Sequence, residues 1–348
     1  MLKLGLMLGY SGKSIHLPLA LIKQAEALGF DSVWVSEAYG SDAVSPAAWI
    51  LAQTTTIRVG TSIMQIPART PAMTAMTAMT LNQLSGGRFI LGLGASGPQV
   101  VEGWHGVPYR KPVTRTKEYI QILRTIMARQ APLEFAGELY QLPLQGTGST
   151  GLGKPLKSIM QADTSIPIYT ASITPAGLTA AAEFADGVFP AWMSPTRFEA
   201  LGPHLEAGFA KAGTGKSLAN FDVAPNLTVA VGPDLDALRR PLKAMRALYI
   251  GGMGARNKNF YTSYTSAMGF AAAAEKIQDL YLAGKTEEAA LAVPDDFIDE
   301  TSLIGTESMI RQRAQRWQEA ASKQQVGTLL CNVSQPEALA LLADIFLR

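Results

Sequence analysis

The strongest constraint on this chain is a repeated alternation of short apolar runs with longer segments of helical period. The apolar runs that we expect to be strands span residues 2–8, 32–36, 57–66, 88–93, 166–171, 187–190, 223–231 and 327–333. Most are followed by a segment of helical period, and several of these segments begin with proline, which is favoured at the first position of a helix. Near-continuous apolar strands are typical of a parallel sheet buried on both faces. Eight such units predict an α/β fold, a closed (β/α)8 TIM barrel, rather than an open doubly wound sheet.

The chain is longer than the predicted barrel requires. It has 348 residues, whereas a (β/α)8 barrel needs about 250. We therefore expect two insertions, one after the fourth unit at about 129–165 and one after the seventh unit at about 251–306. No linker divides the sequence, so residues 1–348 are predicted to form a single domain. Met73, Met76 and Met79 recur at a spacing of three, which we interpret as core filling.

Composition excludes several classes of function. The formal net charge is only +2, which argues against nucleic acid as a partner, because phosphate binding needs a basic field. Cys331 is the only cysteine, so a disulfide within the chain and a thiolate metal cluster are excluded. The start lacks the layout of a secretory signal, and no apolar stretch reaches the roughly 20 residues of a membrane helix. We expect a cytoplasmic protein that does not act at a membrane.

A glycine motif follows the fourth predicted strand. Residues 92–97, GLGASG, match G-x-G-x-x-G, but the dinucleotide-binding interpretation also needs a helix directly after the motif and an acidic residue at a second strand end. Here Pro98 follows, and Glu118 lies inside an amphipathic segment. We interpret the motif as a loop at the carboxyl end of a barrel strand whose N–H groups face a phosphate. A tight loop without a ligand is the alternative.

The parts needed for metal or hydrolytic catalysis are missing. His16, His105 and His204 are the only histidines, and their spacing is not that of metal ligands on a helix. No G-x-S-x-G sequence is present, so a hydrolase nucleophile elbow is not expected. We predict no metal site and little dependence of activity on metal.

Polar and basic residues gather where the barrel mouth is expected. Arg110, Lys111, Arg115 and Lys117 lie close together with no acidic residue between Tyr109 and Lys117, which suggests an anionic ligand, although ordinary surface charge is an equal alternative. Active sites of TIM barrels lie on the loops that follow the strands. Glu37 is notable there, because a carboxylate directly after a core strand is otherwise costly. The other polar residues and glycines at strand ends are Gly9, Tyr10, Tyr39, Gln65, Arg69, Ser96, Ser172, Thr174 and Asn332.

Four segments together resemble the bacterial-luciferase-like superfamily of (β/α)8 flavin and deazaflavin oxidoreductases, in particular its branch that uses coenzyme F420. The segments are GFDSVWVSEAYGSDA at 29–43, IRVGTSIMQIPARTP at 57–71, LNQLSGGRFILGLGASGPQVVEGWHG at 81–106 and IPIYTASITPAGLTAAAEFADGVF at 166–189. In addition, FAGELYQLP at 135–143 resembles the hairpin that the family inserts after its fourth unit. The resemblance covers essentially the whole chain.

The resemblance implies a cofactor site at the barrel mouth. A bulge with a non-prolyl cis peptide, here at Ser62–Ile63, would support the deazaflavin or flavin ring from behind. It also implies an acidic residue, Glu37, near the edge of the ring, and homodimers are common in the family. The basic segment with Arg110, Lys111 and Arg115 would meet the anionic tail of F420, which FMN lacks. Phosphate contacts would come from Gly94, Ala95, Ser96 and Gly97, and from Ser172, Ile173 and Thr174.

One departure from the family pattern affects the mechanism. Relatives that oxidise sugars carry a histidine after the acidic residue, whereas this chain has Ala38. A histidine base acting on an alcohol is therefore not expected. Reduction of a polarised C=N or C=C bond needs hydride positioning and a proton donor, for which Tyr39 and Glu37 are the candidates. Trp104 and Tyr10 are candidates to shape the substrate side, with loop packing as the alternative.

The sequence thus predicts an F420-dependent oxidoreductase that moves a hydride between the deazaflavin and a small organic substrate. A reaction like that of methylenetetrahydromethanopterin reductase is one precedent in the family. An FMN-dependent monooxygenase that works with a separate reductase, and a barrel that binds flavin without turnover, are the alternatives. The identity of the substrate and the direction of hydride transfer do not follow from the residues.

Overall fold

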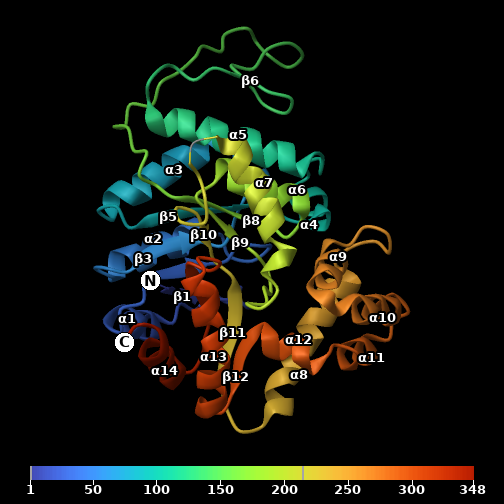
Figure 1. Cartoon of the computed structure of the whole chain (residues 1–348). Helices are drawn as coiled ribbons and strands as arrows, with labels where there is room; N and C mark the ends of the chain where they lie inside the picture. Colours follow the sequence, from blue (N-terminus) through green and yellow to red (C-terminus); the bar gives the residue numbers. More distant parts are fainter. Residues whose placement is uncertain (1, 214) are drawn as a thin grey trace.

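The computed structural model describes residues 2–213 and 215–348, and its centre is a curled parallel sheet surrounded by helices (Figure 1). Neighbouring strands in this sheet all run parallel. In spatial order from β9 to β13, the strands are β9 (Gly187–Phe189), β8 (Ile168–Ala171), β5 (Phe89–Gly94), β3 (Arg58–Thr61), β2 (Ser32–Val35), β1 (Lys3–Met7) and β13 (Thr328–Asn332). The predicted strands are thus confirmed at each of these positions.

The seventh strand closes the ring. It is divided at Ala224 and Pro225 into β10 (Asp222–Val223) and β11 (Asn226–Val231). The first half pairs with β9 and the second half with β13. Across the division, the Ala224 N–H donates to the Val188 carbonyl (2.9 Å) and the Leu330 N–H donates to the Pro225 carbonyl (2.9 Å). The prediction of a barrel is confirmed, with a proline inside the strand that joins its two edges.

Helices follow the strands and cover the outside of the sheet (Figure 1). Several begin where a side chain caps the first turn: the hydroxyl of Thr70 accepts from the N–H of Met73, and Thr174 accepts from Gly177. The helices that follow strands are α1 (Leu19–Ala27), α2 (Val44–Gln53), α3 (Pro71–Leu84), α5 (Pro112–Ala128), α6 (Pro175–Phe184), α7 (Gly202–Ala212), α8 (Leu235–Ala247), α13 (Glu307–Ser322) and α14 (Pro336–Phe346). Short helical turns at η1 (Ile66–Ala68), α4 (Pro98–Gly103) and η2 (Phe198–Ala200) lie in the loops.

The interior of the barrel is a packed core. Trp34 lies at its centre, with ring centroids 5.1 Å from Phe189 and 5.6 Å from Tyr169. A methyl group added to Gly60 would lie 2.3 Å from the Trp34 ring, so only glycine lets β3 pass this indole. Ile63 packs on this cluster from the side of the mouth and remains partly exposed. The other members of the cluster are Met7, Ile90, Ala224 and Leu330.

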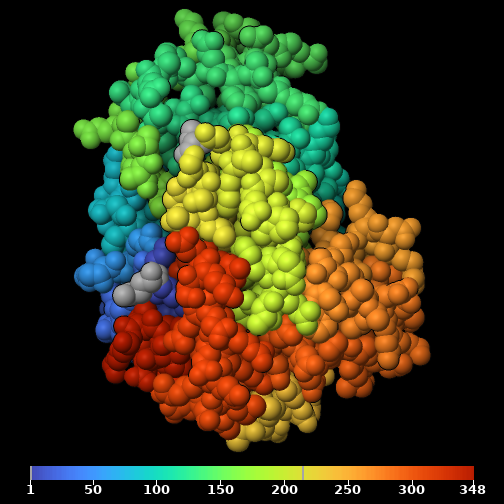
Figure 2. Space-filling model, viewed as in Figure 1, coloured from blue at the N-terminus to red at the C-terminus, as the bar shows by residue number. Residues whose placement is uncertain are grey.

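The first insertion contains the predicted hairpin. Strands β6 (Phe135–Ala136) and β7 (Gln141–Leu142) pair antiparallel. The buried carboxylate of Glu118 on α5 accepts hydrogen bonds from the N–H groups of Glu138, Leu139 and Tyr140 and so fixes the turn. This segment projects from the body of the molecule (Figure 2).

The second insertion is more regular than the sequence suggests. Residues 248–300 form a cluster of helices on one side of the barrel (Figures 1 and 2). The insertion includes a strand, β12 (Ser302–Gly305), which pairs with β11 on the edge opposite β13. Four residues are too short a run to stand out in the sequence. The helices are η3 (Leu248–Gly252), α9 (Phe260–Thr265), η4 (Ser266–Phe270), α10 (Ala271–Leu282), α11 (Thr286–Leu291) and α12 (Asp295–Glu300).

The interpretation of the three methionines on α3 as core residues is wrong for two of them. Met79 is buried, but Met73 is 54% exposed and Met76 is 52% exposed. A spacing of three turns each successive side chain by about 60° around an α-helix, so three such residues cannot share one narrow face. Within the described part of the chain, no helix is both long and apolar enough to span a membrane.

Candidate active site

The loops that follow the strands bring most of the predicted site residues to one end of the barrel. Tyr10 follows β1, Glu37 and Tyr39 follow β2, and Ser62 and Ile63 follow β3. Because the strands are parallel, these loops share the carboxyl edge of the sheet, which is where TIM barrels carry their active sites. Tyr10 is 65% exposed and Tyr39 is 68% exposed. Large aromatic side chains thus stand in solvent around the mouth.

Glu37 is buried and fully engaged. Its two oxygens receive both terminal nitrogens of the Arg69 guanidinium, at 2.7 and 2.9 Å. The same oxygens accept the N–H groups of Ala43 and Gln65, each at 2.9 Å. Burial alone would lower the pKa of Arg69, but the hydrogen bonds and charge of Glu37 outweigh it and raise that pKa. The carboxylate joins the loop after β2 to the loop after β3 and has no free oxygen with which to serve as a proton donor.

The residues after β3 form the floor of the mouth. The peptide bond between Ser62 and Ile63 is cis, at the position that the resemblance predicts. Next in the chain come β4 (Met64–Gln65) and its pairing with β5, in which Gln65 lies opposite Gly94. The side-chain amide of Gln65 donates to the Ala38 carbonyl (2.6 Å), while its buried Oε1 atom has no partner.

The first two glycines of the G-x-G-x-x-G motif have a packing role. A methyl group on Gly92 would lie 1.8 Å from the carbonyl oxygen of Thr61, and one on Gly94 would lie 2.7 Å from the Ile63 side chain. These glycines let β5 approach β3 and the residues after it. Ala95, Ser96 and Gly97 follow in a half-buried loop, and a contact of this loop with phosphate stays a prediction.

The second group of predicted phosphate contacts lies on the neighbouring loop, since β8 pairs with β5. Ser172, Ile173 and Thr174 are half-buried there. Thr174 caps α6, and a methyl group on Gly177 would lie 2.0 Å from the Ser172 hydroxyl, so this hydroxyl lies over the first turn of the helix. The N-terminal ends of helices favour anions.

The basic segment separates into three different environments. A small cavity brings Arg110 and Arg115 together with Ala95 of the glycine loop. Arg115 donates to the Pro108 carbonyl at 3.4 Å. Lys111 instead forms an ion pair with Glu138 of the hairpin, so its charge is directed at the insertion. Among the described residues, Arg110 is exposed and forms no ion pair.

The structure adds a group of residues that the sequence analysis does not identify. Trp192 in the loop after β9 packs against Tyr249 (centroids 5.4 Å apart) and Tyr261 (5.2 Å) of the second insertion. Tyr10 lies near this group. Partial burial of the Tyr10 hydroxyl, together with neighbouring Tyr249 and Tyr39, raises the pKa of Tyr10 to about 12. The guanidinium of Arg246 lies over the Trp192 ring. The concentration of aromatic residues at 249–264 is the one signal in the sequence that points to this group.

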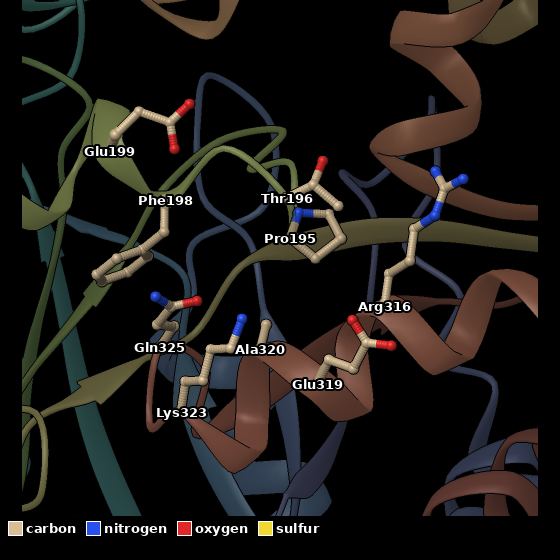
Figure 3. Close-up of a pocket in the computed structure, with 9 residues that line it drawn as sticks. All are labelled: Pro195, Thr196, Phe198, Glu199, Arg316, Glu319, Ala320, Lys323 and Gln325. Atoms are coloured by element: carbon tan, nitrogen blue, oxygen red, sulfur yellow. The ribbon is translucent and has the colours of Figure 1, made fainter.

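A separate cavity lies away from the predicted site. It has a volume of about 430 Å³ and is bounded by residues 195–199 on one side and by the C-terminal half of α13 on the other (Figure 3). Glu199, Arg316, Glu319 and Lys323 give its lining charges of both signs, and none of the predicted site residues reaches it. Trp104, a predicted substrate-side residue, is 67% exposed in the loop after α4. Within the described residues, no group of three or more His, Cys, Asp or Glu side chains is placed to hold a metal ion.

Comparison with known proteins gives the same result along most of the chain. The sequence profile of the family described as luciferase-like monooxygenase matches residues 2–324. A protein of Mycobacterium tuberculosis, provisionally named as a coenzyme F420-dependent oxidoreductase, is 42% identical over 94% of this chain and 95% of its own length. A 5,10-methylenetetrahydromethanopterin reductase of Archaeoglobus fulgidus is 31% identical over 88% of this chain and 87% of its own. The solved F420-dependent tetrahydromethanopterin reductase of Methanopyrus kandleri superposes with a TM-score of 0.75 at 23% identity, covering 99% of this chain and 98% of that one.

Proposed function

Because this chain belongs to the luciferase-like monooxygenase family, we propose that it is an oxidoreductase that uses coenzyme F420 to move a hydride to or from a small organic substrate at the barrel mouth. The observation that carries the proposal is the likeness to the mycobacterial protein, which extends over nearly the full length of both chains. When bound, the deazaflavin would supply the hydride donor or acceptor. The protein would supply binding, orientation and a proton.

The floor of the mouth fits a planar ring. Ile63 presents a partly exposed apolar side chain that the barrel core supports from below. Two residues further along the chain, the buried Oε1 atom of Gln65 is an acceptor without a partner among the described residues. A buried acceptor of this kind is costly unless a donor reaches it, and an N–H group of the bound cofactor would supply one.

The anionic part of the cofactor fits the side of the mouth formed by the loops after β5 and β8. Under this proposal Ala95, Ser96, Gly97, Ser172, Ile173 and Thr174 hold the phosphate, chiefly through backbone N–H groups and hydroxyls. Arg110 and Arg115 lie next to Ala95 in the small cavity and would meet the charged tail. Lys111 contributes less, because Glu138 already neutralises it.

Glu37 and Tyr39 take different roles. We infer that Glu37 positions the mouth, since its oxygens already accept four hydrogen bonds. This revises the expectation that Glu37 donates a proton. The hydroxyl of Tyr39 remains the candidate donor, with Tyr10 beside it. A methylenetetrahydromethanopterin-type substrate is one polarised acceptor to test, and a homodimer stays a prediction.

Titration with the two cofactors tests the proposal against an FMN-dependent monooxygenase. We expect the purified protein to bind F420 and to bind FMN much more weakly. In R110Q the affinity for F420 should fall about 2–5-fold, the effect of one exposed charge pair, while K111Q, the matched control, should change it less. Tight binding of FMN with negligible binding of F420 would reject the proposal. Binding of F420 without hydride exchange across a substrate panel would favour a non-catalytic barrel.

A further inference from the structure

Arg246 is the most unusual charged residue of the molecule. It lies near the end of α8, is only 2% exposed, and its guanidinium carbon lies 4.2 Å from the centroid of the Trp192 ring. Tyr249, one turn further along the chain, and Tyr261 on α9 pack on the same indole. The guanidinium is therefore buried against a cluster of aromatic rings.

This guanidinium lacks the partner that its burial demands. Within residues 2–213 and 215–348 no hydrogen bond or ion pair of Arg246 is present, and its buried Nε atom is unpaired. Burial lowers the pKa of Arg246 to about 9, with the neighbouring Tyr249 opposing the shift, so the group is still charged at neutral pH. An unpaired charge in a protein interior is strongly unfavourable unless an opposite charge reaches it.

Arg197 shows what the same contact looks like when it is complete. Its guanidinium also lies over an aromatic ring, that of Phe270 at 4.9 Å. There, however, both oxygens of Glu300 accept from the guanidinium, at 2.9 and 3.2 Å. The stacking of an arginine on a ring therefore does not replace a carboxylate in this fold, and the carboxylate is what Arg246 lacks.

The environment of Arg246 selects the kind of anion. One guanidinium balances one negative charge, and its planar fork matches the two oxygens of a carboxylate. The side chains around the guanidinium are aromatic, which favours an anion with an apolar or aromatic body over a strongly hydrated one such as inorganic phosphate. Tyr10 connects this group to the barrel mouth, because its hydroxyl is close enough to Tyr249 to interact with it electrostatically while the Tyr10 residue is 65% exposed.

We propose that Arg246 binds the carboxylate of the substrate, so that this protein acts on a small organic acid whose apolar body lies among Trp192, Tyr249 and Tyr261. The assignment of the anion to the substrate rests on the proposed function. The binding of an anion at Arg246 does not, and it is tested separately.

The test uses sodium benzoate as the probe, with benzamide as the neutral compound of the same shape. Binding to the full-length protein is followed by tryptophan fluorescence, and W192F identifies the part of the signal that comes from the ring under Arg246. We expect a saturable signal with benzoate and none with benzamide. R246Q should weaken benzoate binding about 10–100-fold, as expected for hydrogen bonds to a charged group. R246K, which keeps the charge but loses the fork, should lie between.

Two controls separate this role from a structural one. R197Q removes a ring-stacked arginine that already has its carboxylate, and should leave benzoate binding unchanged. R246M keeps an apolar side chain over Trp192 and should raise the midpoint of thermal unfolding, because an unpaired buried charge is removed. A purely structural arginine would give a lower midpoint.

Three outcomes would overturn the proposal. Equal binding of benzoate and benzamide would exclude recognition of charge, and unchanged benzoate binding in R246Q would place the anion elsewhere. Tighter binding of inorganic phosphate than of benzoate would exclude a carboxylate site. Titration of the same variants with F420 keeps the two proposals apart: R246Q should bind F420 like the wild type, and failure of the wild type to bind F420 would reject the proposed function while leaving the benzoate result intact.

Discussion

The two sides of the barrel mouth differ in whether their buried charges are paired. On the first side, which we call the paired wall, Glu37 and Arg69 neutralise each other and Ile63 lies over Gly94. On the second side, which we call the unpaired wall, Arg246 is buried against Trp192 with Tyr249 and Tyr261 around it and has no carboxylate among the described residues.

This contrast distinguishes residues that position a site from residues whose buried charge is left for a ligand to neutralise. A charge that the protein satisfies with its own side chains needs nothing further and mainly fixes the backbone around it. A buried charge left unsatisfied is retained at a cost in stability. Burial by itself therefore does not identify a binding residue. A buried charged group is a candidate when the protein provides it with no hydrogen-bond or ion-pair partner.

The largest effect is expected at the paired wall. E37A leaves the half-buried guanidinium of Arg69 and the N–H groups of Ala43 and Gln65 without their acceptor, so the free energy of unfolding should fall by about 3–5 kcal/mol. Urea denaturation measures the loss. E37Q, which keeps the shape and part of the hydrogen bonding, should lose less. A decrease in the free energy of unfolding of E37A below about 0.5 kcal/mol, the range of ordinary surface changes, would show that the Glu37–Arg69 pair does not stabilise the paired wall.

The second effect tests the packing beneath that wall. In G92A the new methyl group would lie 1.8 Å from the Thr61 carbonyl oxygen and 2.9 Å from the Phe189 ring, and the free energy of unfolding should fall by about 3 kcal/mol. G97A is the matched control from the same motif, since its methyl group would only approach the flexible end of Gln99 at 3.3 Å. Equal losses in thermal or urea denaturation would contradict a packing role that is specific to the first glycines.

The smallest effect tests two tyrosines of α9, of which Tyr261 belongs to the unpaired wall and Tyr264 is buried three residues further along the same helix. Burial raises the pKa of Tyr261 and of Tyr264 above the ordinary value. In the unfolded chain these hydroxyls ionise near pH 10, whereas in the folded protein they stay protonated. The stability that they contribute is therefore complete below pH 10 and is lost as the pH rises further, by about 1.4 kcal/mol per pH unit for each such group. Urea unfolding between pH 9 and pH 11 should show a shallower decline in Y264F, and an identical slope would contradict this account.

The paired wall could largely be predicted from the sequence, and the unpaired wall could not. The apolar runs locate the strands, and the order of the strands places Glu37, Ile63 and Ser96 at one edge. Local sequence suffices there because each residue lies within a few positions of a strand end. The bonding of Glu37 to Arg69 was not visible, since it depends on the direction of two side chains.

Arg246 escaped prediction for a different reason. It lies in an amphipathic helix, LDALRRPLKAMRA, whose other arginines look the same in sequence. What buries it is the cluster of helices from 248 onwards, and the packing of separate short helices is not encoded in any local pattern. The same holds for β12, whose pairing with β11 depends on how the chain returns after the insertion.

The division of the seventh strand has a consequence for how this architecture can vary. The chain leaves β11 at Val231 and comes back as β12 to pair with that same strand. The start and the finish of this helical segment are thus both attached to β11, whereas ring closure depends on β10 against β9 and on Asn226–Thr228 against β13. A change in the length of this segment therefore need not alter the hydrogen bonds that close the barrel, so one side of the molecule can vary in structure while the opposite side stays the same.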